Sequence, residues 1–95
     1  MPEMRFLIRW PDGKPETCYS PSLVVKDFLT PGQIYPLSDF LARSRSALTI
    51  ASKRVEETYG FACSRAQAQL ARIEIAANAF TDLPDARVSV DAFEE

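Results

Sequence analysis

The chain contains no histidine. Histidine is the side chain that titrates nearest neutral pH, and it is both a frequent general base and the commonest metal ligand. A histidine-based catalytic dyad or triad is therefore excluded. The chain has two cysteines, Cys18 and Cys63, which fall short of the four ligands of a structural zinc site. We expect no metal site and no cofactor within a single chain, and free thiols in a reducing compartment.

Glycine and long apolar runs are also scarce. The three glycines, Gly13, Gly32 and Gly60, are isolated, so no glycine-rich phosphate-binding loop is present. No apolar run approaches the roughly 20 residues that span a bilayer. Residues 1–3 lack the basic and apolar regions of a signal peptide. We therefore expect a cytoplasmic protein that does not enter a membrane.

Composition and charge narrow the class of protein. The 95 residues include 46% hydrophobic and 25% charged side chains, as in an ordinary globular protein. A chain of this length supports one core, so residues 1–95 are expected to form a single domain. The net charge of −2 gives no general attraction to nucleic acid or to an anionic membrane. Acidic residues gather near the C-terminus, where residues 91–95 are expected to form a flexible acidic tail.

The first twenty residues predict a β-hairpin. Apolar side chains alternate at Met4, Phe6, Ile8 and Trp10, the pattern of a strand with one face on a core. Residues 11–13, Pro-Asp-Gly, then reverse the chain into a second strand that runs to residue 20.

Two registers of this hairpin are open. A type I turn followed by a left-handed glycine places Cys18 on the core side. A two-residue type I′ turn instead turns Tyr19 inward and pairs Arg9 with Glu16 across the strands. We favour the first register because proline prefers the first central position of a type I turn.

Two antiparallel helices are predicted in the second half of the chain. Ser38 is expected to cap the first helix, and Gly60 to end it in the left-handed conformation. Ser64 opens a capping box for a second helix that runs to about Phe80. The hairpin and both helices are expected to share one core. Its expected members are Phe6, Ile8, Trp10, Leu48, Ala51, Val55, Leu70, Ile73 and Ala77.

Shorter elements complete the predicted fold. Residues 23–29 are too apolar to be exposed, so we expect a short strand or helical turn there, and residues 34–35 form a short extended piece. Residues 87–91 alternate weakly and are expected to add a third strand at the sheet edge. The sequence thus predicts an α+β fold, in which an N-terminal antiparallel hairpin and a small sheet pack on two long helices.

Few residues are candidates for chemistry. Cys63 immediately precedes the predicted cap of the second helix, where the helix dipole favours a thiolate, although a small buried thiol also suits this position. No pair of carboxylates has a spacing that indicates a hydrolytic dyad. Candidate binding residues form two sets. On the outer hairpin face these are Arg5, Arg9 and Tyr19, and on the first helix they are Arg43, Arg45 and Arg54.

Several short blocks together carry a family resemblance. They are Arg9-Trp10-Pro11-Asp12-Gly13, Cys18-Tyr19-Ser20-Pro21-Ser22, Tyr59-Gly60-Phe61 with Cys63-Ser64, and Gln69-Leu70-Ala71-Arg72-Ile73-Glu74. In this order the chain resembles the small nitrogen-starvation-response proteins encoded beside a nitrilase in bacterial gene clusters. The resemblance covers roughly residues 1–80. It implies a cytoplasmic bacterial protein that accompanies a nitrilase, a radical enzyme of the adenosylmethionine class, an acetyltransferase-like protein and a flavoprotein. It assigns no catalytic residue.

Three functions follow as hypotheses. The first is a non-catalytic accessory protein that binds a protein partner from the same gene cluster. The second is a small thiol enzyme or carrier that uses Cys63. The third is a module that senses a small anionic metabolite through its arginines.

Overall fold

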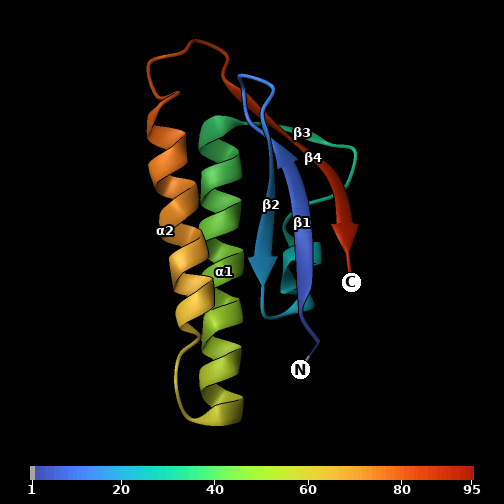
Figure 1. Ribbon diagram of the computed structural model, residues 1–95, viewed down its shortest axis with the longest axis vertical. Helices are drawn as coiled ribbons and strands as arrows, with labels where there is room; N and C mark the ends of the chain where they lie inside the picture. The colour runs from blue at the N-terminus through green and yellow to red at the C-terminus, as the bar shows by residue number, and fades with distance from the viewer. Residues whose placement is uncertain (1) are drawn as a thin grey trace.

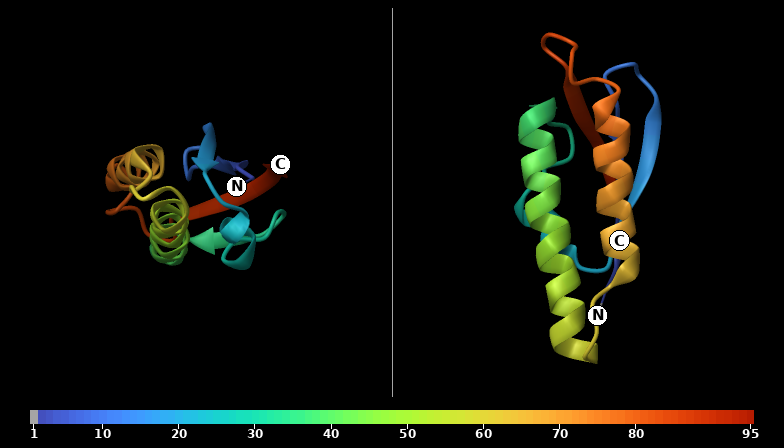
Figure 2. Two further views of the ribbon diagram at one scale, coloured as in Figure 1. Left: turned by 90° about the horizontal axis from the view of Figure 1, so that it is seen from below. Right: turned by 90° about the vertical axis from the view of Figure 1, so that its left-hand side faces the viewer.

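Four strands and two long helices form an α+β fold, which confirms the predicted fold class. The structure is a computed structural model that describes residues 2–95 (Figure 1). In chain order the elements are β1 (Met4–Arg9), β2 (Pro15–Ser20), the 3-10 helix η1 (Leu23–Asp27), β3 (Ile34–Pro36), α1 (Leu37–Tyr59), α2 (Ser64–Asn78) and β4 (Arg87–Glu94). The strands form one antiparallel sheet in the order β2-β1-β4-β3. Both helices pack on the same face of this sheet (Figure 2).

The hairpin of β1 and β2 has the first of the two predicted registers. The Trp10 amide donates a hydrogen bond to the Lys14 carbonyl at 2.9 Å, and Gly13 has a φ of 87°. Phe6 therefore lies opposite Cys18, whose side chain is buried. The alternative register is wrong because the proline-led turn, with glycine in the left-handed conformation, fixes the pairing locally.

The C-terminal strand β4 lies between β1 and β3, whereas the sequence predicts an edge strand. Val88 and Val90 are fully buried on its inner face. Alternation in a sequence records which face of a strand is buried and gives no information about its neighbours. The edges are instead β2 and β3, which contain Pro15 and Pro36, residues without the amide that an interior strand must donate.

Residues 91–94 complete β4, so the predicted flexible acidic tail is wrong for this segment. Glu94 lies opposite Arg5 in the sheet register, and Phe93 packs against the core. The Glu95 carboxylate accepts a hydrogen bond from the Lys26 ammonium at 2.9 Å. Backbone pairing with β1 and one apolar side chain order this segment in spite of its charge.

Both helices begin without the predicted side-chain caps. The helix α1 starts before Ser38, and the Leu37 amide donates to the Ala86 carbonyl at 2.9 Å. Ser64 is already the first residue of α2, and Cys63 holds the cap position with no side-chain hydrogen bond. The Leu37 amide at the start of α1 is thus satisfied by a carbonyl distant in the sequence, and neither helix start uses a side-chain hydroxyl.

Trp10 joins the hairpin to α1 and to the segment that follows α2. Its ring lies edge-on to Phe40 at 5.9 Å between centroids and stacks on Phe80 at 6.0 Å. Its indole Nε1 donates to the Glu16 carboxylate at 3.0 Å, which satisfies the one polar atom of the ring. The predicted core is confirmed. Its buried members are Phe6, Ile8, Trp10, Leu48, Ala51, Val55, Ile73 and Ala77, with Leu70 half-buried beside them.

Among residues 2–95, neither helix combines the length and the apolar composition needed to cross a membrane.

Candidate functional site

Arg43, one of the predicted binding residues, is engaged within the chain. Its guanidinium donates to the Asp39 carboxylate at 3.1 Å and to the Phe28 carbonyl at 2.8 Å. It also lies over the Tyr35 ring, 4.9 Å from the centroid. Arg43 therefore ties α1 to the connection before β3, and these contacts give it a structural role.

The other two arginines of α1, Arg45 and Arg54, contact different residues from Arg43 and from each other. Arg45 faces Glu74 on α2 at 3.6 Å, and Arg54 donates to the Ser22 hydroxyl near η1 at 3.3 Å. Arg43 and Arg54 therefore contact opposite ends of η1, at Phe28 and Ser22, while Arg45 contacts α2. They do not form the shared anionic-ligand site that the sequence leaves open.

The hairpin residues also separate. Arg5 and Arg9 lie exposed on the face of the sheet away from the helices. Tyr19 instead contacts α2, because the Arg65 guanidinium lies 3.9 Å from its ring centroid and the Gln69 side chain accepts from its amide at 2.9 Å. Burial raises the pKa of the Tyr19 phenol, and a hydrogen bond to Glu3 adds to this shift.

Tyr19 and Cys63, two predicted site residues far apart in the sequence, line one apolar groove. The groove has a volume of about 350 Å³ and lies between the end of β2 and the α1–α2 loop. We call it the Cys63 groove. Its lining residues are Glu3, Tyr19, Pro21, Val55, Tyr59, Phe61 and Cys63.

The chemistry of the Cys63 groove favours binding over catalysis. The Cys63 thiol is half-buried at the N-terminus of α2. Among the described lining residues the carboxylate is that of Glu3, and it lies 3.9 Å from the Arg65 guanidinium. The Tyr19 phenol has a raised pKa and so stays protonated near neutral pH. The groove thus presents aromatic and aliphatic surface around one thiol, without a base held by a third group.

Cys18 is the less reactive of the two cysteines. Its side chain is 1% exposed and lies on the inner face of β2. Burial raises the pKa of its thiol strongly, and the nearby Glu16 carboxylate adds to the effect. Cys18 is therefore a core residue, as a mid-strand position favours.

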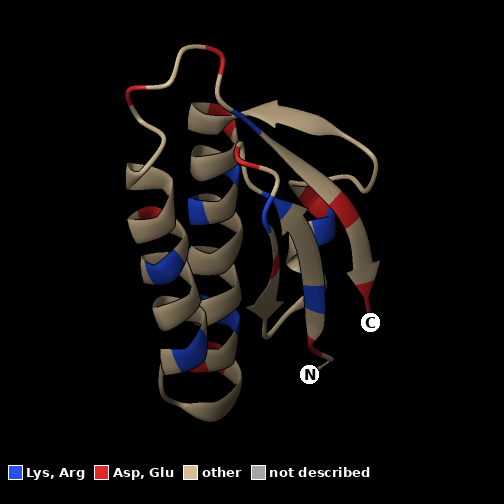
Figure 3. Ribbon diagram, turned by 45° about the horizontal axis from the view of Figure 1, so that its top comes forward, with Lys and Arg blue, Asp and Glu red and all other residues tan. Residues whose placement is uncertain are grey.

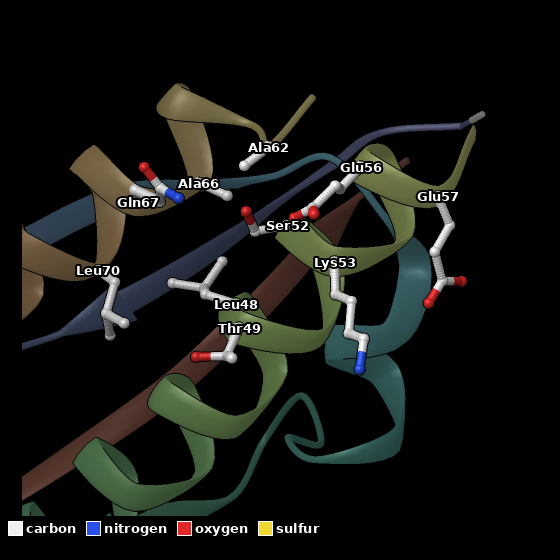
Figure 4. Close-up of a pocket in the computed structure, with 10 residues that line it drawn as sticks. All are labelled: Leu48, Thr49, Ser52, Lys53, Glu56, Glu57, Ala62, Ala66, Gln67 and Leu70. Carbon is white, nitrogen blue, oxygen red and sulfur yellow. The ribbon is translucent and has the colours of Figure 1, made fainter. Parts of the chain in front are cut away.

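A second cavity, the interhelical cleft, lies between α1 and α2 (Figure 4). Its volume is also about 350 Å³. Leu48, Ser52 and Ala66 are buried where they line it, and Glu56 is exposed. The full lining is Leu48, Thr49, Ser52, Lys53, Glu56, Glu57, Ala62, Ala66, Gln67 and Leu70. Among residues 2–95, no three His, Cys, Asp or Glu side chains gather to hold a metal ion.

Residues of the loop that joins the helices line both cavities. Gly60, with a φ of 84°, ends α1 as predicted, and the next residues separate the cavities, since Ala62 lines the cleft while Phe61 and Cys63 line the groove. The rings of Tyr59 and Phe61 lie 6.5 Å apart and are 54% and 67% exposed. We call residues 59–63 the tip. Phe61 is not among the predicted binding residues, although two aromatic residues around a capping glycine are a readable signal in the sequence.

A comparison with known protein families identifies the family to which the chain belongs. A family model described as "Nitrogen starvation-induced protein NitG" matches residues 5–93. The chain belongs to the NitG family. No curated protein and no solved structure matches it significantly.

The NitG match confirms the nitrogen-starvation resemblance. The matched range contains the four-stranded sheet except for Met4 and Glu94, both helices and the whole tip. Membership in the NitG family therefore ties this fold to nitrogen starvation, while the roles of individual residues follow from the geometry alone.

Proposed function

We propose that this NitG-family protein is a non-catalytic accessory protein of the nitrogen-starvation response, which binds a partner protein through its tip. The observation that supports the proposal is the pair of exposed aromatic rings, Tyr59 and Phe61, that line the Cys63 groove next to Ala62 of the interhelical cleft. Aromatic side chains are enriched in protein interfaces, because they bury a large area with few rotatable bonds.

The partner that suits this surface is a folded protein or segment with protruding apolar side chains. The Cys63 groove offers apolar walls, and Phe61, one of the residues that line it, has two thirds of its surface in water. Burying that ring would gain roughly 1.5–3 kcal/mol. Polar groups at the cleft, such as Glu56 and Gln67, supply hydrogen bonds that select among apolar partners.

The resemblance to proteins of nitrilase gene clusters directs the choice of partner. It implies a bacterial, cytoplasmic setting in which the neighbouring products are the nitrilase, the radical enzyme, the acetyltransferase-like protein and the flavoprotein. We therefore infer that the tip binds one of these enzymes. A binding role needs no base beside Cys63 and no cofactor in the chain.

A capture experiment tests this function. The tagged chain is recovered from nitrogen-starved cells and compared with Phe61→Ser at the tip and Ile75→Ser on α2, where the isoleucine is 71% exposed. We expect the wild type and Ile75→Ser to recover the same cluster enzyme, and Phe61→Ser to lose it. Recovery of no cluster enzyme, or equal recovery by all three chains, would contradict the proposal.

One observation favours the thiol alternative as the second candidate. Cys63 holds the cap position of α2 and opens into a groove large enough for a small molecule. A thiol carrier or enzyme would form a covalent bond at Cys63 Sγ. The alkylation experiment in the Discussion separates this candidate from the binding role.

A further inference from the structure

The sheet has one face that the helices leave open. Both helices lie on the other face (Figure 2), where Met4, Phe6 and Ile8 of β1 are at most 1% exposed. The alternate residues of the same strand, Arg5 and Arg9, are exposed. The open face is continuous over the two central strands, β1 and β4.

Charges on the open face are sorted by strand. Arg5 lies opposite Glu94 in the register, and the Arg9 Nε atom lies 3.3 Å from the Asp91 carboxylate. Positive charge therefore follows β1, and negative charge follows the C-terminal half of β4, beyond the exposed Arg87 at the start of that strand (Figure 3). Two facing rows of side chains run along these strands. They are Arg5, Leu7 and Arg9 on β1, and Glu94, Ala92 and Asp91 on β4.

These charges are available to another molecule. Among residues 2–95, neither Arg5 nor Glu94 makes an ion pair. Arg9 pairs with Asp91 and also donates to the Gly13 carbonyl at 2.8 Å, but the Arg9 and Asp91 side chains are still 51% and 39% exposed. An exposed pair of this kind contributes little to stability and can exchange partners.

We propose that the open face binds a second copy of the chain, related by a two-fold axis that runs parallel to the strands between β1 and β4. Such an axis lays β1 of one protomer over β4 of its partner at the same height. Arg5 then meets Glu94 of the partner subunit, and Arg9 meets the partner's Asp91. Leu7 packs on the partner's Ala92 at the centre, and every contact occurs twice.

The charges exclude the other simple arrangement. A two-fold axis across the strands would lay β1 over β1 and bring Arg5 against Arg9 of the partner subunit. Like charges placed against each other cost several kcal/mol in an interface. The sorting of charge by strand therefore selects the axis that runs along the strands.

An apolar residue at the sheet edge supports the same axis independently. Ile34 of β3 is 60% exposed. It stands at one end of a row that crosses the sheet from β3 to β2 through Ile34, Ser89, Arg9 and Pro15. The proposed axis reverses this row. It places Ile34 over the partner's Pro15 at both ends, so two exposed apolar residues cover each other.

The proposal goes beyond the binding role of the tip and does not rest on it. The interface is confined to one face of a small sheet, so we expect a dimer that dissociates on dilution. Because the axis runs along the strands, the tips of both protomers lie at the same end of the dimer. The dimer would thus present two copies of the partner-binding surface in one direction.

Sedimentation velocity over a range of protein concentrations tests the dimer. We expect the wild type to dimerise, and Arg5→Glu and Glu94→Arg each to weaken dimerisation at least about tenfold, because each places like charges across the interface twice. Lys53→Glu makes the same charge change as Arg5→Glu on α1, and it should leave dimerisation unchanged. Circular dichroism checks that each variant is folded.

Mixing the two variants separates contacts between chains from contacts within one chain. In an Arg5→Glu chain positions 5 and 94 are both acidic, and in a Glu94→Arg chain both are basic. Each variant alone repels itself, but a mixed pair carries two attractive contacts across the interface. An equimolar mixture should therefore dimerise as the wild type does. A wild type that stays monomeric, variants that still dimerise, a mixture that stays monomeric, or a loss with Lys53→Glu would overturn the proposal.

Discussion

Ile73 and Ile75 on α2 provide a matched test of the helix faces on which the whole arrangement depends. Ile73 is 0% exposed and belongs to the central core, whereas Ile75, two residues along the same helix, is 71% exposed. Replacing Ile73 with alanine removes three carbon atoms from a packed site. At about 0.8 kcal/mol each, their transfer to water costs roughly 2.4 kcal/mol.

The cavity that remains adds to this cost. The neighbours of Ile73 relax only in part, so we expect Ile73→Ala to lower the free energy of unfolding by about 3–4 kcal/mol. A domain of this size has about 5–15 kcal/mol in all, so the loss is a large fraction. Ile75→Ala removes little buried surface and improves helix propensity, so it should change the free energy of unfolding by no more than about 0.5 kcal/mol.

Urea denaturation measures both values. The midpoint of Ile73→Ala should fall strongly while the slope with urea stays that of the wild type, and the midpoint of Ile75→Ala should stay close to wild type. Equal and mild effects of the two substitutions would refute the assignment of the α2 faces. The cleft and the tip derived from those faces would then be wrong as well.

Three further predictions concern single groups. Iodoacetamide at neutral pH should label Cys63 in the folded chain and Cys18 only in denaturant, because burial raises the pKa of the Cys18 thiol. Mass spectrometry locates the label, and labelling of Cys63 in the folded chain faster than in the unfolded chain would favour the thiol-enzyme function. Glu16 accepts hydrogen bonds from the Trp10 indole at 3.0 Å and from Arg72 of α2 at 2.9 Å. Glu16→Ala should therefore lower the free energy of unfolding by about 1–3 kcal/mol in urea melts, more than removal of the exposed Arg72 does. A cost near zero would mean that these two hydrogen bonds do not stabilise the fold. Because the pKa of Tyr19 is raised, the folded chain keeps a proton that the unfolded chain loses near pH 10.0, so stability should fall as the pH rises through that value. Thermal melts of Tyr19→Phe should show a shallower fall with pH. An equal fall for the variant and the wild type would mean that the phenol titrates normally in the folded chain.

Local signals in the sequence determine the parts of the fold that were predicted correctly. The turn at residues 11–13 carries its own conformational preference, so the hairpin register and the burial of Cys18 follow from it. Gly60 ends α1 for the same kind of reason. The start of α1 was predicted wrongly because the Leu37 amide finds a carbonyl about fifty residues away along the chain, which no local pattern records.

The candidate site depends on contacts that sequence spacing does not contain. Cys63 and Tyr19 are each identifiable as chemical groups, but only the packing of β2 against α2 places them in one groove. The arginines behave in the opposite way. Arg43 and its neighbours along α1 look like one basic surface, yet each has a different partner, because residues close on a helix can face different elements.

Binding of the purified chain to a purified cluster enzyme tests the central claim most directly. Isothermal titration should give a saturable complex with one of the cluster enzymes, and Phe61→Ser should raise its Kd by about 10–100-fold, the equivalent of the roughly 1.5–3 kcal/mol gained by burying the ring. Ile75→Ser, which removes an equally exposed apolar side chain far from the tip, should leave the Kd unchanged. No binding by any cluster enzyme, or the same Kd for Phe61→Ser and the wild type, would contradict the account.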